Sequence, residues 1–540
     1  MATTRPATSQ RINRLRENLT AYVFLAPALI LLFLFGIFPV GFAFFVSLHR
    51  WRRFPGEYLG LDNYIRGLGG FGYGLFFWLG AGVLIYALLQ VRSLWRTRAD
   101  RSLSYLVPGM LNAAAILLFV RWFVVVLPLI LNIPQQLRNQ ELVQGIFVQQ
   151  LVTNLGLPEA VEAWTPFLLV AILASAASAI WWFVVRGAER GLHLFRGTVA
   201  ALFVAVSFFT LQLTLAEINA GGEAATQGTQ IIMVTVGAAL VVGAYLIWRR
   251  AVRVFENRRF ALMAGAALLL MVGGVVLIAE VPRLLANADQ AVLRSFGITV
   301  MFALGTVPFQ LAIGLVLAYL LFQKIKARSF FRVVYFLPYI MPFVATSIVF
   351  NQIFSQRPGS LANHALGFFG VPDQRWLLEA RGIVEVIFGA NVPDILAGPS
   401  LALIVIMIYT VWTYIGYDTA VFLAGLGNIS GELYEAARID GASGWSIFRY
   451  ITLPLLSPTT FFLSLIAVIG TFQAFTQIWI MRTPASQNAV DTLSVYIFET
   501  VRATDPNMGY GSALSFVLFG VILLLTVFQN RLAENRVFYG

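Results

Sequence analysis

A polar stretch, residues 431–456, reads GELYEAARIDGASGWSIFRYITLPLL. Apolar runs lie on both sides of it, at roughly 399–424 and 456–480. A run of about 20 apolar residues is long enough to cross a bilayer as a helix. The stretch is therefore predicted to be a loop between two membrane helices, with Pro454 placed where proline suits the opening turn of the second helix.

This loop carries the signals of two short helices. Ser430 can cap the first, and Glu432 and Glu435 lie in its first turns, where the helix dipole favours negative charge. Gly441 permits the positive φ at which a helix ends, and Ser443 can then cap the second short helix. We predict a compact knob of helix, glycine corner and helix, a shape suited to a groove on a partner protein.

The composition of the whole chain is that of a polytopic membrane protein. Of its 540 residues, 59% are hydrophobic and 11% are charged, against about 25% charged in soluble domains. The apolar runs predict an all-α fold of about twelve transmembrane helices. Their expected positions are roughly 21–47, 71–91, 103–131, 165–186, 197–216, 229–248, 260–282, 295–322, 333–354, 399–424, 456–480 and 510–530.

The net charge of +12 is explained by membrane topology, so no nucleic-acid partner is expected. Basic residues gather at the amino terminus and in alternate loops, near 92–101, 186–196, 249–259 and 324–332. Because basic loops stay inside, both termini and the loop of Glu435 are predicted to be cytoplasmic, after an even number of crossings. Arg50, Arg52 and Arg53 disagree with this pattern, since they follow the first helix on the outer side.

The sequence predicts neither a metal site nor a bound cofactor. It has no cysteine, and its three histidines, His49, His193 and His364, lack ligand spacing. No G-x4-G-K-[ST] phosphate cradle is present, and neither lysine, Lys324 or Lys326, follows a glycine. Transport energy is therefore not expected to come from nucleotide bound to this chain.

The loop resembles the EAA loop of ABC-importer permeases. That pattern, EAA-x3-G-x9-I-x-LP, is matched without a gap by Glu435-Ala436-Ala437, Gly441 and Ile451-Thr452-Leu453-Pro454. The longer runs 422–426, 432–442 and 451–456 resemble the carbohydrate branch, the membrane subunits of maltose and glycerol-phosphate importers. The resemblance implies a type I ABC importer permease core with an ATPase-coupling loop that contains Glu435, Ala436, Ala437, Asp440, Gly441, Ala442 and Pro454.

The same resemblance implies a transport subunit that is not itself an enzyme. It would form the pathway for a carbohydrate or a related polyol or sugar phosphate. The complete machine would hold a second permease subunit, two ATPase subunits that bind ATP and Mg, and an extracytoplasmic sugar-binding protein. Its place would be the cytoplasmic (inner) membrane of a bacterium or archaeon, in contact with lipid.

The resemblance covers two separated blocks of the chain. Residues 58–64, YLGLDNY, resemble the segment after the first helix of sugar permeases, and the core resumes only near Arg294. We therefore expect an amino-terminal segment with the first helix (1–67), an inserted segment of about six transmembrane helices (68–290), and the permease core with the coupling loop (291–540). If the first and third of these segments were joined directly, they would form a complete six-helix permease.

Polar and aromatic residues on the two helices that flank the loop indicate a substrate pathway. Sugars present hydroxyl groups and flat C–H faces, and polar side chains within a membrane usually line a pathway or pair with one another. By resemblance to maltose-type permeases, which hold sugar with these two helices, and from residue type, the candidates are Gly416, Tyr417, Thr419, Thr471, Gln473 and Gln477. Helix packing explains the aromatics equally well, and the family's Asn-rich run is here Thr471-Phe472-Gln473-Ala474.

Two other classes of function remain open at this level. A secondary, ion-coupled carrier of small solutes also has about twelve helices, although it would show inverted repeats or midplane acids. A membrane enzyme would need acids clustered in a large outer loop. Arg121, in the middle of an inserted helix, is expected to pair with backbone or a carboxylate in preference to binding substrate.

Overall fold

The computed structural model describes residues 7–96, 105–138, 145–184, 190–220, 224–252, 257–323, 326–389, 392 and 394–534. Arg5, Lys324 and parts of the charged loops at 92–101, 186–196 and 249–259 lie outside these residues, so the charge pattern stays a sequence-based prediction. The described chain is helical, apart from the isolated bridges His49–Tyr58 and Gly382–Ser400. It divides into two compact units, the first formed by Met1–Asn287 with Asp505–Ala513 and the second by Ala288–Thr504 with Leu514–Gly540.

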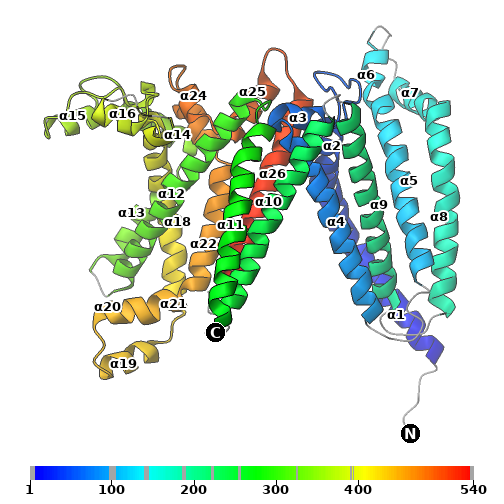
Figure 1. Cartoon of the computed structure of the whole chain (residues 1–540), viewed down its shortest axis with the longest axis horizontal. Coiled ribbons are helices and arrows are strands. Elements are labelled where there is room, and N and C mark those ends of the chain that lie inside the picture. Colours follow the sequence, from blue (N-terminus) through cyan, green and yellow to red (C-terminus); the bar gives the residue numbers. More distant parts are fainter. Residues whose placement is uncertain are drawn as a thin grey trace. The chain divides into compact units, whose positions relative to one another are not determined.

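Within the described residues, ten helices are long and apolar enough to cross a membrane, or up to twelve if each of two bent pairs counts as one span. This confirms the predicted all-α, polytopic fold. The ten are α1 (Ala7–Leu32) continued through η1 (Phe33–Ile37) into α2 (Phe38–Ser47), α4 (Phe71–Arg96), α5 (Leu106–Leu131), α8 (Pro158–Val184), α9 (Arg190–Ala220), α10 (Ala224–Ala251), α11 (Asn257–Leu284), α12 (Gln290–Phe322), α18 (Leu401–Gly427) and α26 (Met508–Ala533) (Figure 1).

The predicted helix 333–354 is wrong as a single element. It is two helices, α13 (Arg328–Ile340) and α14 (Phe343–Ile353), bent by 98° at Met341 and Pro342. A residue before proline is pushed out of the helical region, and Met341 is accordingly extended, with φ −67° and ψ 145°.

The predicted helix 456–480 also breaks. α22 (Ser457–Phe472) ends early, and the short α23 (Thr476–Met481) follows it. The hydroxyl of Ser494 donates to the carbonyl of Phe472 at 3.0 Å, and that of Thr492 donates to the carbonyl of Ala474 at 3.3 Å. Tertiary hydrogen bonds thus occupy carbonyl groups at the point where a continuous helix would have used them.

The first unit is a set of long helices packed in neighbouring pairs. Helix α5 packs against α8 and α9, α4 against α9, and α10 against α11. The short helices α3 (Asp62–Leu68), α6 (Ile133–Gln136) and α7 (Ile146–Leu155) belong to the same unit. Its α4 to α11 come from the segment predicted to be inserted, whose boundaries remain a prediction.

The 58–64 segment is held by buried polar contacts within the first unit. Asn63 donates to the carbonyl of Ser47 at 2.8 Å, and the hydroxyl groups of Ser47 and Tyr64 lie 2.7 Å apart. Glu217, at the end of α9, accepts a hydrogen bond from the backbone N–H of Leu61. Gly60 beside it has φ +57°, and a Cβ there would collide with the Glu217 carboxylate. The end of α9 therefore supports this turn.

Carboxylates compensate two of the three arginines that contradict the charge pattern. Arg50 pairs with Glu57 at 3.0 Å, and Arg52 pairs with Asp505 at 2.6 Å. Both pairs lie in the first unit. The positive-inside bias counts Lys and Arg and is not a net-charge rule, so these ion pairs do not remove the disagreement with the predicted sidedness.

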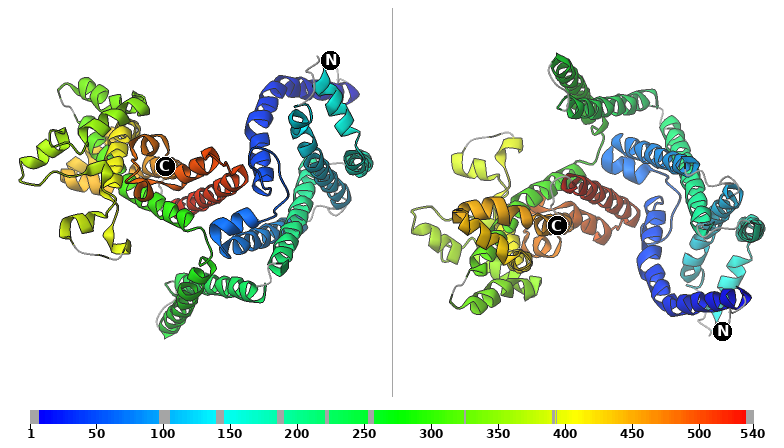
Figure 2. Two further views of the ribbon diagram at one scale, coloured as in Figure 1. Left: turned by 90° about the horizontal axis from the view of Figure 1, so that it is seen from above. Right: turned by 90° about the horizontal axis from the view of Figure 1, so that it is seen from below.

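The second unit is built around α18 and can be followed in Figure 2 from green (α12) through yellow (α18) to red (α26). Helix α18 packs against α12, α13 and α22. The buried Tyr409 of α18 belongs to an apolar cluster that also includes Phe302, Phe350 and Ile478, and it places its hydroxyl 2.7 Å from that of Thr346 on α14. Short helices complete the unit: α15 (Leu361–Gly367), η2 (Trp376–Leu378), α16 (Ile383–Phe388), α17 (Asp394–Ala397), α24 (Gln487–Val490) and α25 (Leu493–Arg502).

Candidate functional site

The loop between α18 and α22 begins with α19 (Gly431–Ile439), which is capped at both ends. The Ser430 hydroxyl accepts a hydrogen bond from the N–H of Glu432 at 3.3 Å, as predicted. At the other end Gly441 has φ +75°. The N–H of Gly441 bonds the carbonyl of Arg438 at 3.1 Å, and that of Ala442 bonds Ala437 at 2.9 Å. This is the Schellman arrangement, in which a glycine with positive φ ends the helix.

The second part of the loop starts at Ser443, whose hydroxyl accepts from the N–H of Ser446 at 3.2 Å and so caps α20 (Gly444–Ile447), also as predicted. A π-helical turn, η3 (Phe448–Thr452), and α21 (Leu453–Leu455), which contains Pro454, lead into α22 with a bend of 62°. The hydroxyl groups of Tyr434 and Thr452 lie 3.3 Å apart. This contact links the two parts of the loop across 18 residues.

Aromatic contacts hold the loop against the end of α12. The rings of Tyr319 and Phe448 are 4.9 Å apart, and those of Phe322 and Tyr434 are 6.4 Å apart. Within the second unit, α19 and α20 lie at the end opposite α15, α16 and α24 (Figure 1). The loop is thus a defined projection attached to three helices: α12, α18 and α22.

The predicted loop residues differ in exposure. Glu435, Ala436, Asp440 and Gly441 are exposed, whereas Ala437, Ala442 and Pro454 are half-buried.

Sequence reasoning missed three large apolar side chains on the same loop: Ile439 is 86% exposed, Trp445 71% and Tyr450 77%. Their signal was available, since each is a large apolar residue within an otherwise polar stretch. Together they form what we call the apolar loop patch (Ile439, Trp445 and Tyr450).

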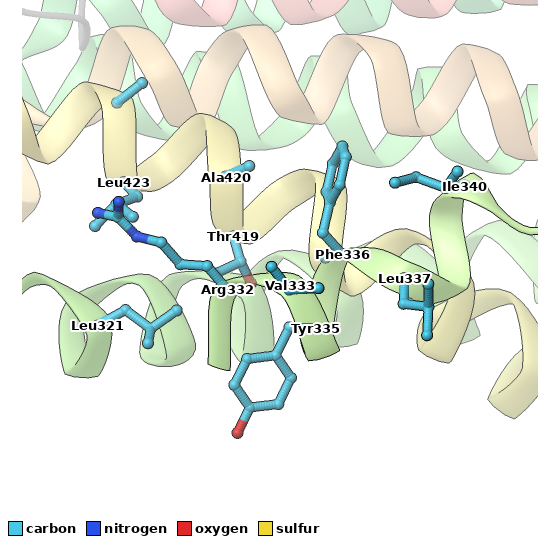
Figure 3. A pocket seen from close by; sticks show the side chains of 12 residues that line it. Leu321, Arg332, Val333, Tyr335, Phe336, Leu337, Ile340, Thr419, Ala420 and Leu423 are labelled. Atoms are coloured by element: carbon cyan, nitrogen blue, oxygen red, sulfur yellow. The ribbon is translucent and has the colours of Figure 1, made fainter. Parts of the chain in front are cut away.

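A cavity of about 570 Å³ lies beside α18, between it, α13 and the end of α12 (Figure 3). Arg332 supplies the only formal charge among the lining residues, and Thr419 adds a hydroxyl group, whereas the ring of Tyr335 points away from the other lining side chains (Figure 3). The remaining lining residues are apolar or glycine. The full lining is Leu321, Arg332, Val333, Tyr335, Phe336, Leu337, Ile340, Gly416, Thr419, Ala420, Leu423 and Ala424.

Two of the predicted pathway residues, Gly416 and Thr419, line this cavity. Gly416 lets α18 approach α13 closely, because a Cβ there would collide with the carbonyl of Tyr335. The hydroxyl of Thr419 donates to the carbonyl of Ile415 at 2.6 Å. A hydroxyl bonded in this way still has a free lone pair that can accept a further hydrogen bond.

Tyr417 belongs to an aromatic group that joins α18 to the α13–α14 bend. Its ring stacks on Tyr339 at 5.0 Å, and Tyr339 also contacts Tyr414 at 5.9 Å. Phe343 stacks on Tyr414 at 6.0 Å. Sequence reasoning placed the aromatic platform on the helices that flank the loop and did not assign Tyr339 and Phe343 to it.

The other three predicted pathway residues do not line the cavity. The hydroxyl of Thr471 donates to the carbonyl of Ala467 at 2.9 Å. Gln473 is exposed at the end of α22, and Gln477 is buried on α23. The structure therefore brings two of the six candidates to one cavity and leaves α22 and α23 apart from it. A substrate role for any of the six remains a prediction.

Asp418 faces α12 and is not among the cavity residues. It is 2% exposed, and one of its carboxyl oxygens, Oδ2, has no hydrogen-bond partner among the described residues. Gly314 of α12 makes room for it, since a Cβ on that glycine would come within 2.8 Å of the Asp418 Cβ.

Comparison with known proteins places this loop and its flanking helices within one matched region. Residues 310–538 match the family described as binding-protein-dependent transport system inner membrane component. The chain is 31% identical over 243 residues to the lactose transport system permease protein LacF of Rhizobium radiobacter, covering 44% of this chain and 74% of that protein.

Two further relatives are of similar kind. The arabinooligosaccharides transport system permease protein AraP of Bacillus subtilis is 31% identical, covering 44% of this chain and 70% of that protein. The sn-glycerol-3-phosphate transport system permease protein UgpA of Agrobacterium fabrum is 30% identical, covering 47% and 79%. A chain of a solved bacterial ABC transporter involved in alginate import is 20% identical, with a TM-score of 0.39, and covers 46% of this chain and 80% of that one.

Proposed function

Because this chain belongs to the family of binding-protein-dependent transport system inner membrane components, we propose that it carries a carbohydrate across the membrane and that its 430–456 loop couples it to a separate ATPase. Family membership makes the chain a permease subunit of an ABC importer, a multi-pass inner membrane protein and not an enzyme, as the sequence predicted. It also disfavours the ion-coupled carrier and the membrane enzyme that the sequence left open.

The observation that carries the coupling proposal is the apolar loop patch of Ile439, Trp445 and Tyr450, each at least 71% exposed. Leaving one large apolar side chain in water in place of burying it costs about 1.5–3 kcal/mol. Exposed apolar surface rimmed by polar residues is typical of a protein interaction site. The exposed Glu435 and Ala436 lie on the same short helix as Ile439, so the predicted coupling residues and the patch offer one surface to a partner.

A rigid loop suits this role, because a partner that moves it must also move the helices attached to it. The caps at Ser430, Gly441 and Ser443, together with the Tyr434–Thr452 contact, restrict internal motion of the loop. Its displacement would pass directly to α18 and α22. Helix α18 lines the cavity, so ATP-driven movement would reach the proposed pathway without a long chain of intermediates.

The carbohydrate class rests on the relatives and on the chemistry of the cavity. The relatives are named for lactose, arabinooligosaccharides and sn-glycerol 3-phosphate. Of the residues that line the cavity, Phe336 offers an aromatic ring to the C–H faces of a sugar, and Thr419 can accept hydrogen bonds from its hydroxyl groups. We propose that the assembled importer adds a second permease subunit, two ATPase subunits that bind ATP and Mg, and an extracytoplasmic sugar-binding protein, with both termini of this chain cytoplasmic.

The coupling proposal is tested by the double variant Trp445→Ala, Tyr450→Ala. Co-expressed with an ATPase subunit that co-purifies with the unaltered chain, the variant should retain less than about a tenth of that ATPase, since two buried anchors account for roughly 2 kcal/mol or more. Leu361→Ala is the matched control, because Leu361 is 65% exposed on α15, at the opposite end of the unit. Undiminished ATPase recovery in the double variant would refute the role of the patch.

Uptake into proteoliposomes tests the substrate class. The reconstituted complex with its binding protein should take up lactose or an arabinooligosaccharide, or else sn-glycerol 3-phosphate, in an ATP-dependent manner. Uptake of the phosphate ester alone would indicate that the Arg332 guanidinium acts as an anion contact. If amino acids stimulate ATP hydrolysis by the importer and none of these three compounds does, the carbohydrate assignment is refuted.

A further inference from the structure

An arginine lies exposed at the middle of a membrane span in the first unit. The apolar run of α5 extends over residues 113–131, and Arg121 is its only polar member. The candidate span is Leu106–Gln136, so 15 residues separate Arg121 from each end. At 1.5 Å per residue this is about 22 Å of helix on either side. The apolar run 113–131 is about 28 Å long, close to the thickness of the hydrocarbon core, and residue 122 is its middle, so Arg121 lies near mid-depth when this run crosses the bilayer.

The described chain provides no partner for this guanidinium. Arg121 has no hydrogen bond, ion pair or ring contact within the described residues. The neighbouring rings contact one another instead: Trp122 lies 4.7 Å from Trp164 and 5.6 Å from Phe119. The sequence led us to expect pairing with backbone or a carboxylate, and neither contact is found.

Lipid head groups lie out of reach of the Arg121 guanidinium. Half of the hydrocarbon core is about 15 Å thick, which is longer than the three-methylene stem of an arginine. Ionised side chains at this depth are rare and almost always face protein or water, where they find a partner. The exposed aliphatic residues next to Arg121, Val120 (49% exposed) and Val124 (40%), leave a smooth helix face on which another helix can pack.

We propose that this face of α5 docks a transmembrane helix of a different protein, which places an Asp or Glu carboxylate beside Arg121. A second copy of this chain does not supply that group. In the described candidate spans, the carboxylates Glu159, Glu162, Glu217 and Glu280 all lie within five residues of a helix end, and Asp418 is buried. The acid must therefore come from another chain, at matching depth.

Photo-crosslinking in the native membrane tests this docking. A benzophenone amino acid is placed at Val124 of the full chain, and the crosslinked peptide is identified by mass spectrometry. The expected peptide comes from another polypeptide and is apolar except for an Asp or Glu near its centre. Its yield should fall at least tenfold in Arg121→Leu and persist in Arg121→Lys, because the lysine keeps the charge. Ile172 on α8, 59% exposed, is the matched control position, and its crosslinks should not depend on residue 121.

A charge exchange completes the test. Arg121→Glu should abolish the crosslink, and replacing the identified partner carboxylate with Lys should restore it. Crosslinks to phospholipid alone, to a second copy of this chain, or to a polypeptide whose yield is unchanged in Arg121→Leu would each overturn the proposal. Arg121→Leu adds an apolar group to an apolar helix, so its insertion and purification serve as the folding check.

Discussion

Helices α18 and α5 are similar in length, but their surroundings differ. In the most apolar window of α18, 61% of the residues are buried inside the protein, against 11% for α5, although α5 is the more apolar helix, with a mean hydropathy of 2.6 against 1.5. α18 carries polar groups that its neighbours enclose, such as Thr410 and Thr413, whose hydroxyl groups donate to carbonyls of α18 itself. α5 presents its one charged side chain, Arg121, to the surroundings of the chain.

The fold itself fixes the environment of α18, whereas lipid or another protein must supply that of α5. An enclosed span can keep threonines, an aspartate and a close glycine contact, because the fold fixes their environment. A span whose faces do not pack against its own chain depends on contacts with lipid or with another protein for its stability. The segment predicted to be inserted contains six such spans, whose apolar windows are only 11–22% buried. We therefore expect substitutions in the second unit to affect transport and those in the first unit to affect stability or assembly.

The largest effect is expected from Gly441→Val. A β-branched residue at φ +75° is strained by roughly 1–3 kcal/mol, and the Schellman end of α19 would be lost. Uptake should fall to background and ATPase binding should weaken, while membrane insertion stays normal. Gly444→Ala is the control, since no atom lies within 4 Å of its Cβ position and its φ is not positive. Normal uptake by the valine variant would show that the glycine end of α19 is not needed for coupling.

The double variant Thr471→Ala, Gln473→Ala asks whether α22 shares the pathway with α18. Each lost hydrogen bond is worth roughly 0.5–1.5 kcal/mol, so uptake should fall about tenfold or more if both groups contact substrate. Thr500→Ala on α25 is the control, because its hydroxyl is bonded to its own helix in the same way. Unchanged uptake would restrict the pathway in this subunit to the cavity beside Gly416 and Thr419, or assign substrate binding to the partner permease.

Gly60→Ala should reduce the stability of the first unit without a direct effect on transport. Its φ of +57° and the contact with the Glu217 carboxylate both oppose a side chain, at a cost of about 1–3 kcal/mol. Thermal unfolding in detergent should show a lower midpoint. In Gly82→Ala, a helical position on α4 with open space, the midpoint should stay the same or rise, because alanine is the better helix former. Equal midpoints for the two variants would contradict the supporting role of α9.

The smallest effect concerns Asp491, which lies outside the candidate spans. Burial raises the pKa of its carboxyl group to about 6, against the opposing effect of the Arg482 guanidinium 2.8 Å away. An acid whose pKa is raised on folding favours the folded state while it is protonated, so stability should decline between about pH 4 and pH 6 and then level off. The thermal midpoint of Asp491→Asn should no longer decline over this pH range. The midpoint of Asp373→Asn, a change at an exposed aspartate, should still decline.

The sequence predicted local features well because their causes are local. The Ser430 and Ser443 caps and the positive φ of Gly441 follow from residue types within a few positions, and the structure confirms all three. The family and the all-α membrane fold are also confirmed. The coupling and substrate assignments, the three-part domain division and the sidedness of the termini stay predictions.

The errors arose where distant parts of the chain decide the outcome. The end of α22 depends on hydroxyl groups from Thr492 and Ser494, about 20 residues away. Similarly, the cavity forms against α13, whose break at Pro342 turned a predicted straight span into two helices. An apolar pattern gives the length of a span, but not where tertiary hydrogen bonds interrupt it.

The capped construction of the loop has a consequence for the timing of transport. A loop that had to refold in each cycle would add a slow ordering step to every turnover. In this chain both ends of α19 and the start of α20 already satisfy their backbone groups, and the Tyr434–Thr452 contact joins the two parts. The loop can therefore relax as one body, and the slow microsecond-to-millisecond events are left to the rearrangement of whole helices. The turnover rate should then be sensitive to changes in helix packing and insensitive to changes that merely stiffen the loop.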